Sequence, residues 1–101
     1  MSSFDDSLTI PKVRSVDLSA DSLTVSLSDG RELSVPLAWY PRLLNGTSAE
    51  RANLEIVGQG EGLHWPELDE DISVEALIRG LSSQESPVSL DRWLKGRGHI
   101  A

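Results

Sequence analysis

The residues best suited to chemistry lie in one acidic stretch in the second half of the chain. Carboxylates at this spacing could hold a cation, serve as an acid–base pair or form a docking surface for a basic partner. They could equally stand at the start of a helix, where the helix dipole favours negative charge. The stretch has no compensating Lys or Arg, and its carboxylates are Glu67, Asp69, Glu70, Asp71 and Glu75.

The spacing of these carboxylates does not fit a metal site. An EF-hand loop over this stretch would place Val74 where the loop needs Gly, and Gly80 where it needs Glu. His64 and Glu67 would need a helix to share a metal, and Pro66 opposes a helix. Because the chain has two His and no Cys, we expect neither a metal nor a cofactor.

Motifs for catalysis are missing from the sequence. It has no Gly-x-Ser-x-Gly nucleophile elbow and no His-Glu-x-x-His zinc motif. The glycine-rich run at residues 58–62 is followed by neither the helix of a dinucleotide loop nor the Gly-Lys-Ser/Thr of a P-loop. We interpret this run as a hairpin connection, and we expect no catalytic activity.

Aromatic side chains are the second class of candidate contacts, because large rings anchor cores and also form interface hot spots. We place Trp39 and Trp65 mainly in the core, although Trp65 also borders the acidic stretch. Trp93 is the better interface candidate, because a small domain has little apolar face left for a late helix. The candidate partner-binding residues are Trp65, Glu67, Asp69, Glu70, Asp71 and Trp93.

Composition excludes several classes of partner. The 101 residues carry a formal net charge of −7 and a pI near 4.6, whereas phosphate binding needs clustered cations. No apolar run approaches the roughly 18 residues of a membrane span. The N-terminal residues lack the basic start and apolar core of a signal peptide. We therefore expect a cytoplasmic protein without direct nucleic-acid or membrane contact.

Alternating apolar residues predict three short strands between residues 16 and 37, each with one buried face. The alternation of apolar residues restricts the strand register, because residues directly opposite in an antiparallel pair point to the same face. A two-residue turn at residues 21–22 then joins the first two strands. It pairs Ala20 with Leu23, Leu18 with Val25 and Val16 with Leu27.

The second connection needs an odd number of residues. A two-residue Asp-Gly turn would set Leu27 opposite Glu32 and split the apolar faces. We therefore predict a three-residue loop at 28–30, with Gly30 in the left-handed conformation and a bulge after it. This loop pairs Val25 with Leu33 and Leu23 with Val35.

Helix signals follow the three strands. Residues 38–53 predict two helical turns, with Pro41 near the start of the first and a capping box beginning at Thr47 for the second. Two further strands are predicted at 54–57 and 63–65.

The clearest helix spans residues 74–79, between the capping residue Ser73 and the terminating residue Gly80. A last short helix follows, which Ser89 could cap. Its apolar side carries Leu90, Trp93 and Leu94.

These elements predict an α+β fold, with a small antiparallel β-meander sheet and short helices packed on one face. The predicted organisation has three parts. Residues 1–12 form a flexible N-terminus, residues 13–81 the domain, and residues 82–101 a linker with the short C-terminal helix.

The stretch from Gly62 to Gly80 closely resembles the signature of a bacterial family known as domain of unknown function 2442. The run Trp-Pro-x-Leu-Asp-Glu-Asp-Ile-Ser-Val-Glu carries the resemblance. The Asp-Gly hairpin ending at Gly30 and the run Trp-Tyr-Pro-Arg-Leu at 39–43 support it. The resemblance thus covers about residues 13 to 81.

What the resemblance implies is an interaction module. Some members look fused to a helix-turn-helix domain, and others lie beside a small toxin-like gene in an antitoxin-like arrangement. The residues after Gly80 are too few for a helix-turn-helix domain. We therefore expect a non-enzymatic protein-interaction module, in the role of an antitoxin-like partner of a small basic toxin-like protein.

Two further possibilities remain open at this point. The alternative function is a small-molecule sensor, with its ligand near Trp39, Trp65 and the glycine turn. Exchange of the C-terminal helix between two copies would in addition give a homodimer, because such an exchange needs few new contacts.

Overall fold

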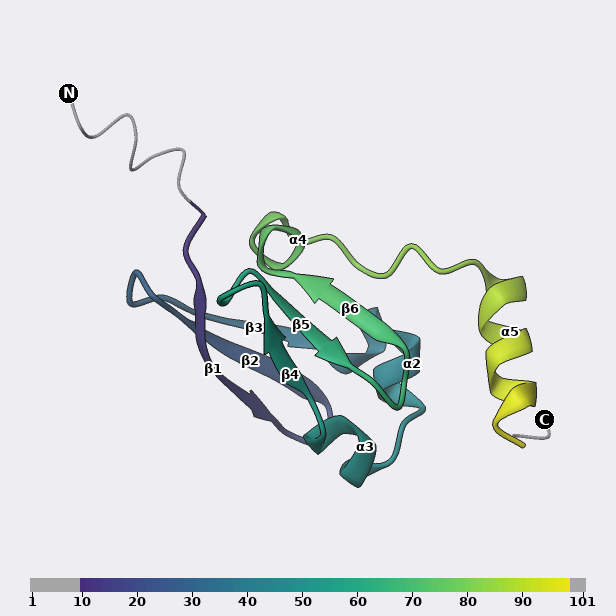
Figure 1. Ribbon diagram of the computed structural model, residues 1–101. Coiled ribbons are helices and arrows are strands. Elements are labelled where there is room, and N and C mark those ends of the chain that lie inside the picture. Colours follow the sequence, from purple (N-terminus) through teal and green to yellow (C-terminus); the bar gives the residue numbers. More distant parts are fainter. Residues whose placement is uncertain (1–9, 99–101) are drawn as a thin grey trace.

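The computed structural model describes residues 10–98 and contains two three-stranded antiparallel sheets that face each other (Figure 1). The strand orders are β1–β2–β3 and β4–β5–β6. The strands are β1 (Val13–Leu18), β2 (Ser22–Leu27), β3 (Glu32–Pro36), β4 (Glu55–Val57), β5 (Gly62–Trp65) and β6 (Glu70–Ser73). The helices are η1 (Leu37–Trp39), α2 (Pro41–Leu44), α3 (Ser48–Ala52), α4 (Val74–Arg79) and α5 (Pro87–Gly96).

The second hairpin of the predicted meander is confirmed. Gly30 has a φ of +93°, which a glycine adopts without steric cost. The Leu27 N–H donates to the carbonyl of Arg31 at 2.8 Å across the three-residue loop. The observed pairs include Val25–Leu33 and Leu23–Val35, as predicted.

The predicted register of the first hairpin is wrong by two residues, because Ser19 closes the turn earlier. Its backbone N–H donates to the carbonyl of Ser22 at 2.9 Å, and its hydroxyl accepts the N–H of Ser22 at 3.1 Å. The turn therefore centres on residues 20–21. A shift by two residues keeps every apolar side chain on its predicted face. The observed pairs include Leu18–Leu23, Val16–Val25 and, after an irregularity between Val13 and Ser15, Val13–Leu27.

The second sheet contains the two predicted strands and a third that the sequence did not predict. Glu70 and Asp71 belong to β6, so the helix-start interpretation of the acidic stretch is wrong for both residues. Acidic residues are poor strand formers, and pairing with β5 holds this strand in place. Glu75 does lie in the first turn of α4.

The three predicted helices between residues 38 and 79 are confirmed, and the start of the last helix is corrected. Both bonds of the Thr47 capping box are present, and Gly80 ends α4 in the left-handed conformation. Helix α5 begins at Pro87, because the hydroxyl of Ser86 accepts the N–H of Ser89 at 3.1 Å. A proline is well suited to the first position after such a cap.

One hydrophobic cluster fills the space between the two sheets. Leu23, Val25 and Leu27 reach it from β2, and Leu63 and Trp65 reach it from β5. The α+β class is therefore confirmed. The layer that covers the meander is mainly the second sheet, with short helices at the sheet ends (Figure 1).

The segment between α4 and α5 is tied to the domain. The Tyr40 hydroxyl donates to the carbonyl of Leu81, and the Ser83 N–H donates to the carbonyl of Trp39, both at 2.9 Å. The predicted flexible N-terminus, residues 1–12, lies mostly outside the described residues. Within it, Lys12 forms an ion pair with Glu61 at 2.9 Å.

Candidate functional site

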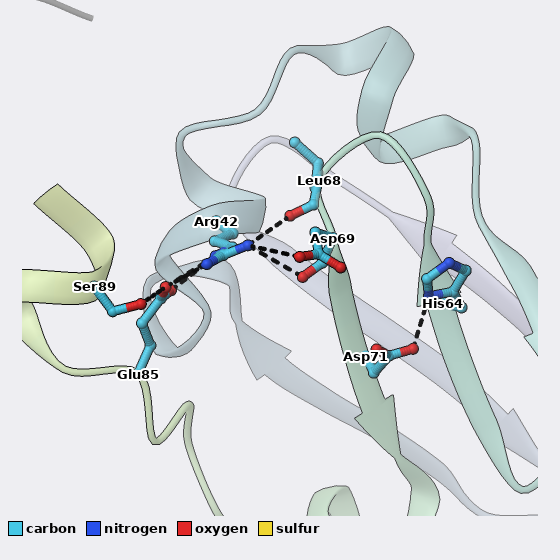
Figure 2. Close-up of polar contacts among 7 residues, drawn as sticks. All are labelled: Arg42, His64, Leu68, Asp69, Asp71, Glu85 and Ser89. Atoms are coloured by element: carbon cyan, nitrogen blue, oxygen red, sulfur yellow. Dashed lines mark hydrogen bonds and ion pairs between the residues drawn. The ribbon is translucent and has the colours of Figure 1, made fainter. Parts of the chain in front are cut away.

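Arg42 of α2 is the centre of a polar cluster at one edge of the fold (Figure 2). Its Nη2 and Nε atoms donate to the carboxylate of Glu85 at 2.6 and 3.0 Å, and the Ser89 hydroxyl donates to the same carboxylate at 2.8 Å. A bidentate Arg–carboxylate pair is among the stronger charged contacts. The hydrogen bonds from Arg42 lower the pKa of Glu85. The pair is therefore charged at neutral pH and fixes the approach to α5.

Asp69 joins this cluster through its backbone. It lies in the turn between β5 and β6 with a φ of +51°, a left-handed conformation that Asp tolerates better than most residues. Its carbonyl accepts a hydrogen bond from Nη1 of Arg42 at 3.2 Å. Its side chain is 85% exposed and lies 3.6 Å from the same nitrogen. The backbone of Asp69 is anchored, and its carboxylate is available to a partner.

Glu70 follows in β6 and is half-buried beside the cluster. Burial raises the pKa of Glu70 to about 7, an effect that Arg42 opposes and Glu85 reinforces. This carboxyl therefore changes its charge near neutral pH. An open hollow beside it is lined by Arg42, Asp69, Glu70, Ser83, Gln84, Glu85 and Ser89.

Helix α5 docks next to this hollow through Trp93 and Arg97. The guanidinium groups of Arg42 and Arg97 lie 5.0 and 4.7 Å from the centre of the Trp93 ring, within the range of cation–π attraction. Arg97 also donates to the carboxylate of Glu50 in α3 at 2.6 and 3.0 Å. These hydrogen bonds lower the pKa of Glu50 to about 2.

The outer face of the second sheet carries a separate acidic row. Strand pairing places Glu55, His64 and Asp71 side by side on β4, β5 and β6. Nδ1 of His64 lies 2.7 Å from a carboxylate oxygen of Asp71 (Figure 2). In the turn after β5, Glu67 accepts a hydrogen bond from Asn53 at 2.9 Å. The carboxylates of Glu55 and Asp71 on this face are solvent-exposed, and so is Val57, which lies on the same side of β4 as Glu55.

The predicted partner-binding residues do not form one patch. Trp65 is completely buried, and its indole N–H donates to the carbonyl of Arg51 at 2.9 Å, so a partner cannot reach it. The core interpretation is correct for this residue, and its candidacy as a partner contact is wrong. Asp69, Glu70 and Trp93 gather around Arg42, whereas Glu67 and Asp71 belong to the sheet face.

Sequence patterns alone do not identify the residues that assemble the cluster. Arg42 stands within the aromatic run at 39–43, and Glu50 is the third residue after Thr47 in the predicted capping box. The spacing of Trp93 and Arg97, one helical turn apart, was the signal that could have indicated a shared docking surface.

Two findings about the described residues bear on other classes of site. Within residues 10–98, no three His, Asp or Glu side chains are arranged to hold a metal ion. Over the same residues, none of the helices combines the length and apolar content that crossing a bilayer requires.

Comparison with known proteins yields solved structures and a family. A crystal structure of a protein of unknown function from Rhodospirillum rubrum is 29% identical with a TM-score of 0.66, over 76% of this chain and 95% of that chain. A solution structure of an uncharacterised protein from Chromobacterium violaceum has a TM-score of 0.63 at 20% identity, over 99% of this chain and 86% of that one. The second likeness shows the fold alone. A search of curated proteins found no match.

The family model described as protein of unknown function (DUF2442) matches residues 13–83. This range begins with β1 and ends in the segment tied to η1, so it contains both sheets together with Arg42, Asp69 and Glu70, and it stops before Glu85 and Ser89. The chain therefore belongs to the DUF2442 family.

Proposed function

We propose that this chain is a non-enzymatic protein-interaction module that binds a small basic protein in the cytoplasm, as an antitoxin-like partner. The observation that carries the proposal is the outer face of the second sheet. Its three strands contain no Lys or Arg, and Glu55 and Asp71 on this face and Glu67 in its adjoining turn are exposed to solvent. A basic surface is the complement of such a face.

Net charge supports the same proposal. A formal charge of −7 attracts a basic protein over distance and raises the rate of encounter. The family resemblance implies an antitoxin-like gene arrangement. We therefore expect the partner to be encoded by the neighbouring gene.

Capture of a partner tests the proposal. A tagged full-length chain, expressed in its own host, is expected to retain a basic protein in stoichiometric amount, identified by mass spectrometry. The alternative function, a small-molecule sensor, makes a different prediction. Recovery of no stoichiometric protein, together with saturable thermal stabilisation by a metabolite, would favour the sensor.

The proposal also excludes catalysis by this chain. Hydrolase and nucleotide-turnover screens are expected to remain at background. Turnover that disappears in Asp69→Asn, Glu70→Gln or Asp71→Asn would overturn this part of the proposal, since these carboxylates are the most plausible acid–base groups in the stretch.

A further inference from the structure

Helix α5 is held on the domain by side chains that a foreign basic helix could also offer. Arg97 contacts Glu50 by two hydrogen bonds, and Trp93 stacks with Arg42 and Arg97. No residue of α5 is buried. The helix therefore lies on the surface of its own domain and contributes no buried residue to the core.

The surface beneath α5 matches the helix in charge at Arg97. The helix and its C-cap carry Arg92, Lys95 and Arg97 against one acidic residue, Asp91, which pairs with Lys95 at 3.0 Å. The receiving surface offers the carboxylate of Glu50 to Arg97, with Asp69 and Glu70 nearby around Arg42. A helix with an aromatic residue and an Arg one turn later would satisfy the same groups.

The residues matched by the family model include the surface beneath α5 but not α5 itself. The match ends at residue 83, so it includes Arg42 and Glu50 and stops before α5. We propose that α5 is a built-in competitor, which occupies the site where a basic, aromatic helix of the partner docks. This inference rests on the proposed function for the nature of the partner, and it adds a second contact surface and a means of regulating access to it.

Competition requires that α5 can leave its site, and the contacts allow this. The Arg97–Glu50 pair is largely covered and Trp93 is partly buried against the hydrophobic cluster, but these are few contacts, and a ten-residue helix is marginal by itself in water. When α5 leaves, the tie between Arg42 and Glu85 keeps it close to the domain. Its high effective concentration then lowers the affinity for any competing helix.

The experiment uses a fluorescent synthetic peptide of residues 86–98, with blocked ends, as the competing helix. Fluorescence anisotropy measures its binding to the full-length chain and to the full-length W93A/R97A variant, in which the internal helix is weakened and the receiving surface is intact. We expect the variant to bind the peptide on the order of tenfold more tightly, because the site is open for more of the time. Adding Glu50→Lys to the variant is expected to abolish binding. Adding Glu32→Lys, on the other sheet, is the matched control and is expected to leave it unchanged.

Equal affinity of the wild-type chain and W93A/R97A, or no binding by either, would overturn the inference. A second measurement needs no substitution. Excess unlabelled peptide added to the ¹⁵N-labelled wild-type chain must move the amide signals of α5 toward those of the free helix, and unchanged signals would contradict the competition. Because the probe is the chain's own segment, these failures leave partner capture through the sheet face untouched.

Discussion

Glu50 and Arg97 are 47 positions apart in the sequence and form an ion pair with N–O distances of 2.6 and 3.0 Å. The Glu50 carboxylate also accepts the N–H of Thr47 at 2.8 Å in the capping box of α3. One side chain therefore caps one helix and holds another. Loss of this carboxylate is expected to affect both the start of α3 and the docking of α5.

A double-mutant cycle with Glu50→Gln and Arg97→Gln isolates the pair. Both side chains are largely but not fully covered, so we expect a coupling energy of about 0.5–1 kcal/mol that shrinks as salt is added. Urea unfolding of the four chains at two salt concentrations measures it. A coupling of zero at low salt would show that the pair contributes nothing to stability.

Glu70 makes stability depend on pH between 4.5 and about 7. Its pKa is raised in the folded chain, so the folded state keeps a proton that the unfolded state has released. The stability from this group is present below pH 4.5 and is lost as the pH rises through about 7. Relative to Glu70→Gln, the wild-type chain should lose about 1–2 kcal/mol between pH 4 and pH 8, after allowance for solvent screening.

Denaturant unfolding across this pH range is the measurement for Glu70. Glu67→Gln removes an exposed carboxylate from the same stretch and serves as the matched control. Identical pH dependence of the wild-type chain and Glu70→Gln would refute the assignment.

Gly60 is a position where any side chain would disturb the fold. Its φ is +98°, and a Cβ there would lie 2.8 Å from Cβ of Lys12 and 3.1 Å from the carbonyl oxygen of Val13. Gly60→Ala should therefore cost about 2–3 kcal/mol. Gly80→Ala is the control, since its φ is +71° with open space around it, and it should cost only about 1 kcal/mol. Equal losses in thermal unfolding would show that the contact with β1 is unimportant.

We propose a homodimer in which two copies of the chain exchange their α5 helices. The same contacts of Trp93 and Arg97 can form within one chain or between two, so an exchanged dimer needs few new interactions. Light scattering should give a dimer for the wild-type chain at high concentration and a monomer for W93A/R97A. Monomers in both samples at every concentration would rule the exchange out.

Local signals predicted much of the fold. The capping residues Thr47 and Ser73 and the terminal Gly80 gave the bounds of α3 and α4 closely, because each acts on neighbouring backbone groups. The alternation of apolar residues predicted the pairing of β2 with β3, because paired residues must lie on the same face of the sheet.

Features that depend on distant contacts were not predictable in the same way. β6 contains two acidic residues, and its strand state comes from pairing with β5. The cluster around Arg42 joins residues from α2, the β5–β6 turn and the segment before α5. No spacing in the sequence brings Arg42 to Glu85, which lies 43 positions later.

The most direct test of the account is titration calorimetry of the captured basic protein with charge-reversed chains. The variant Glu67→Lys/Asp71→Lys changes the exposed acidic face, and Asp17→Lys/Glu32→Lys makes the same change in charge on the first sheet. We predict that the first variant binds on the order of 30-fold more weakly than the wild-type chain, and that the second loses much less. Undiminished affinity in the first variant, or equal losses in both, would contradict binding through the outer face of the second sheet.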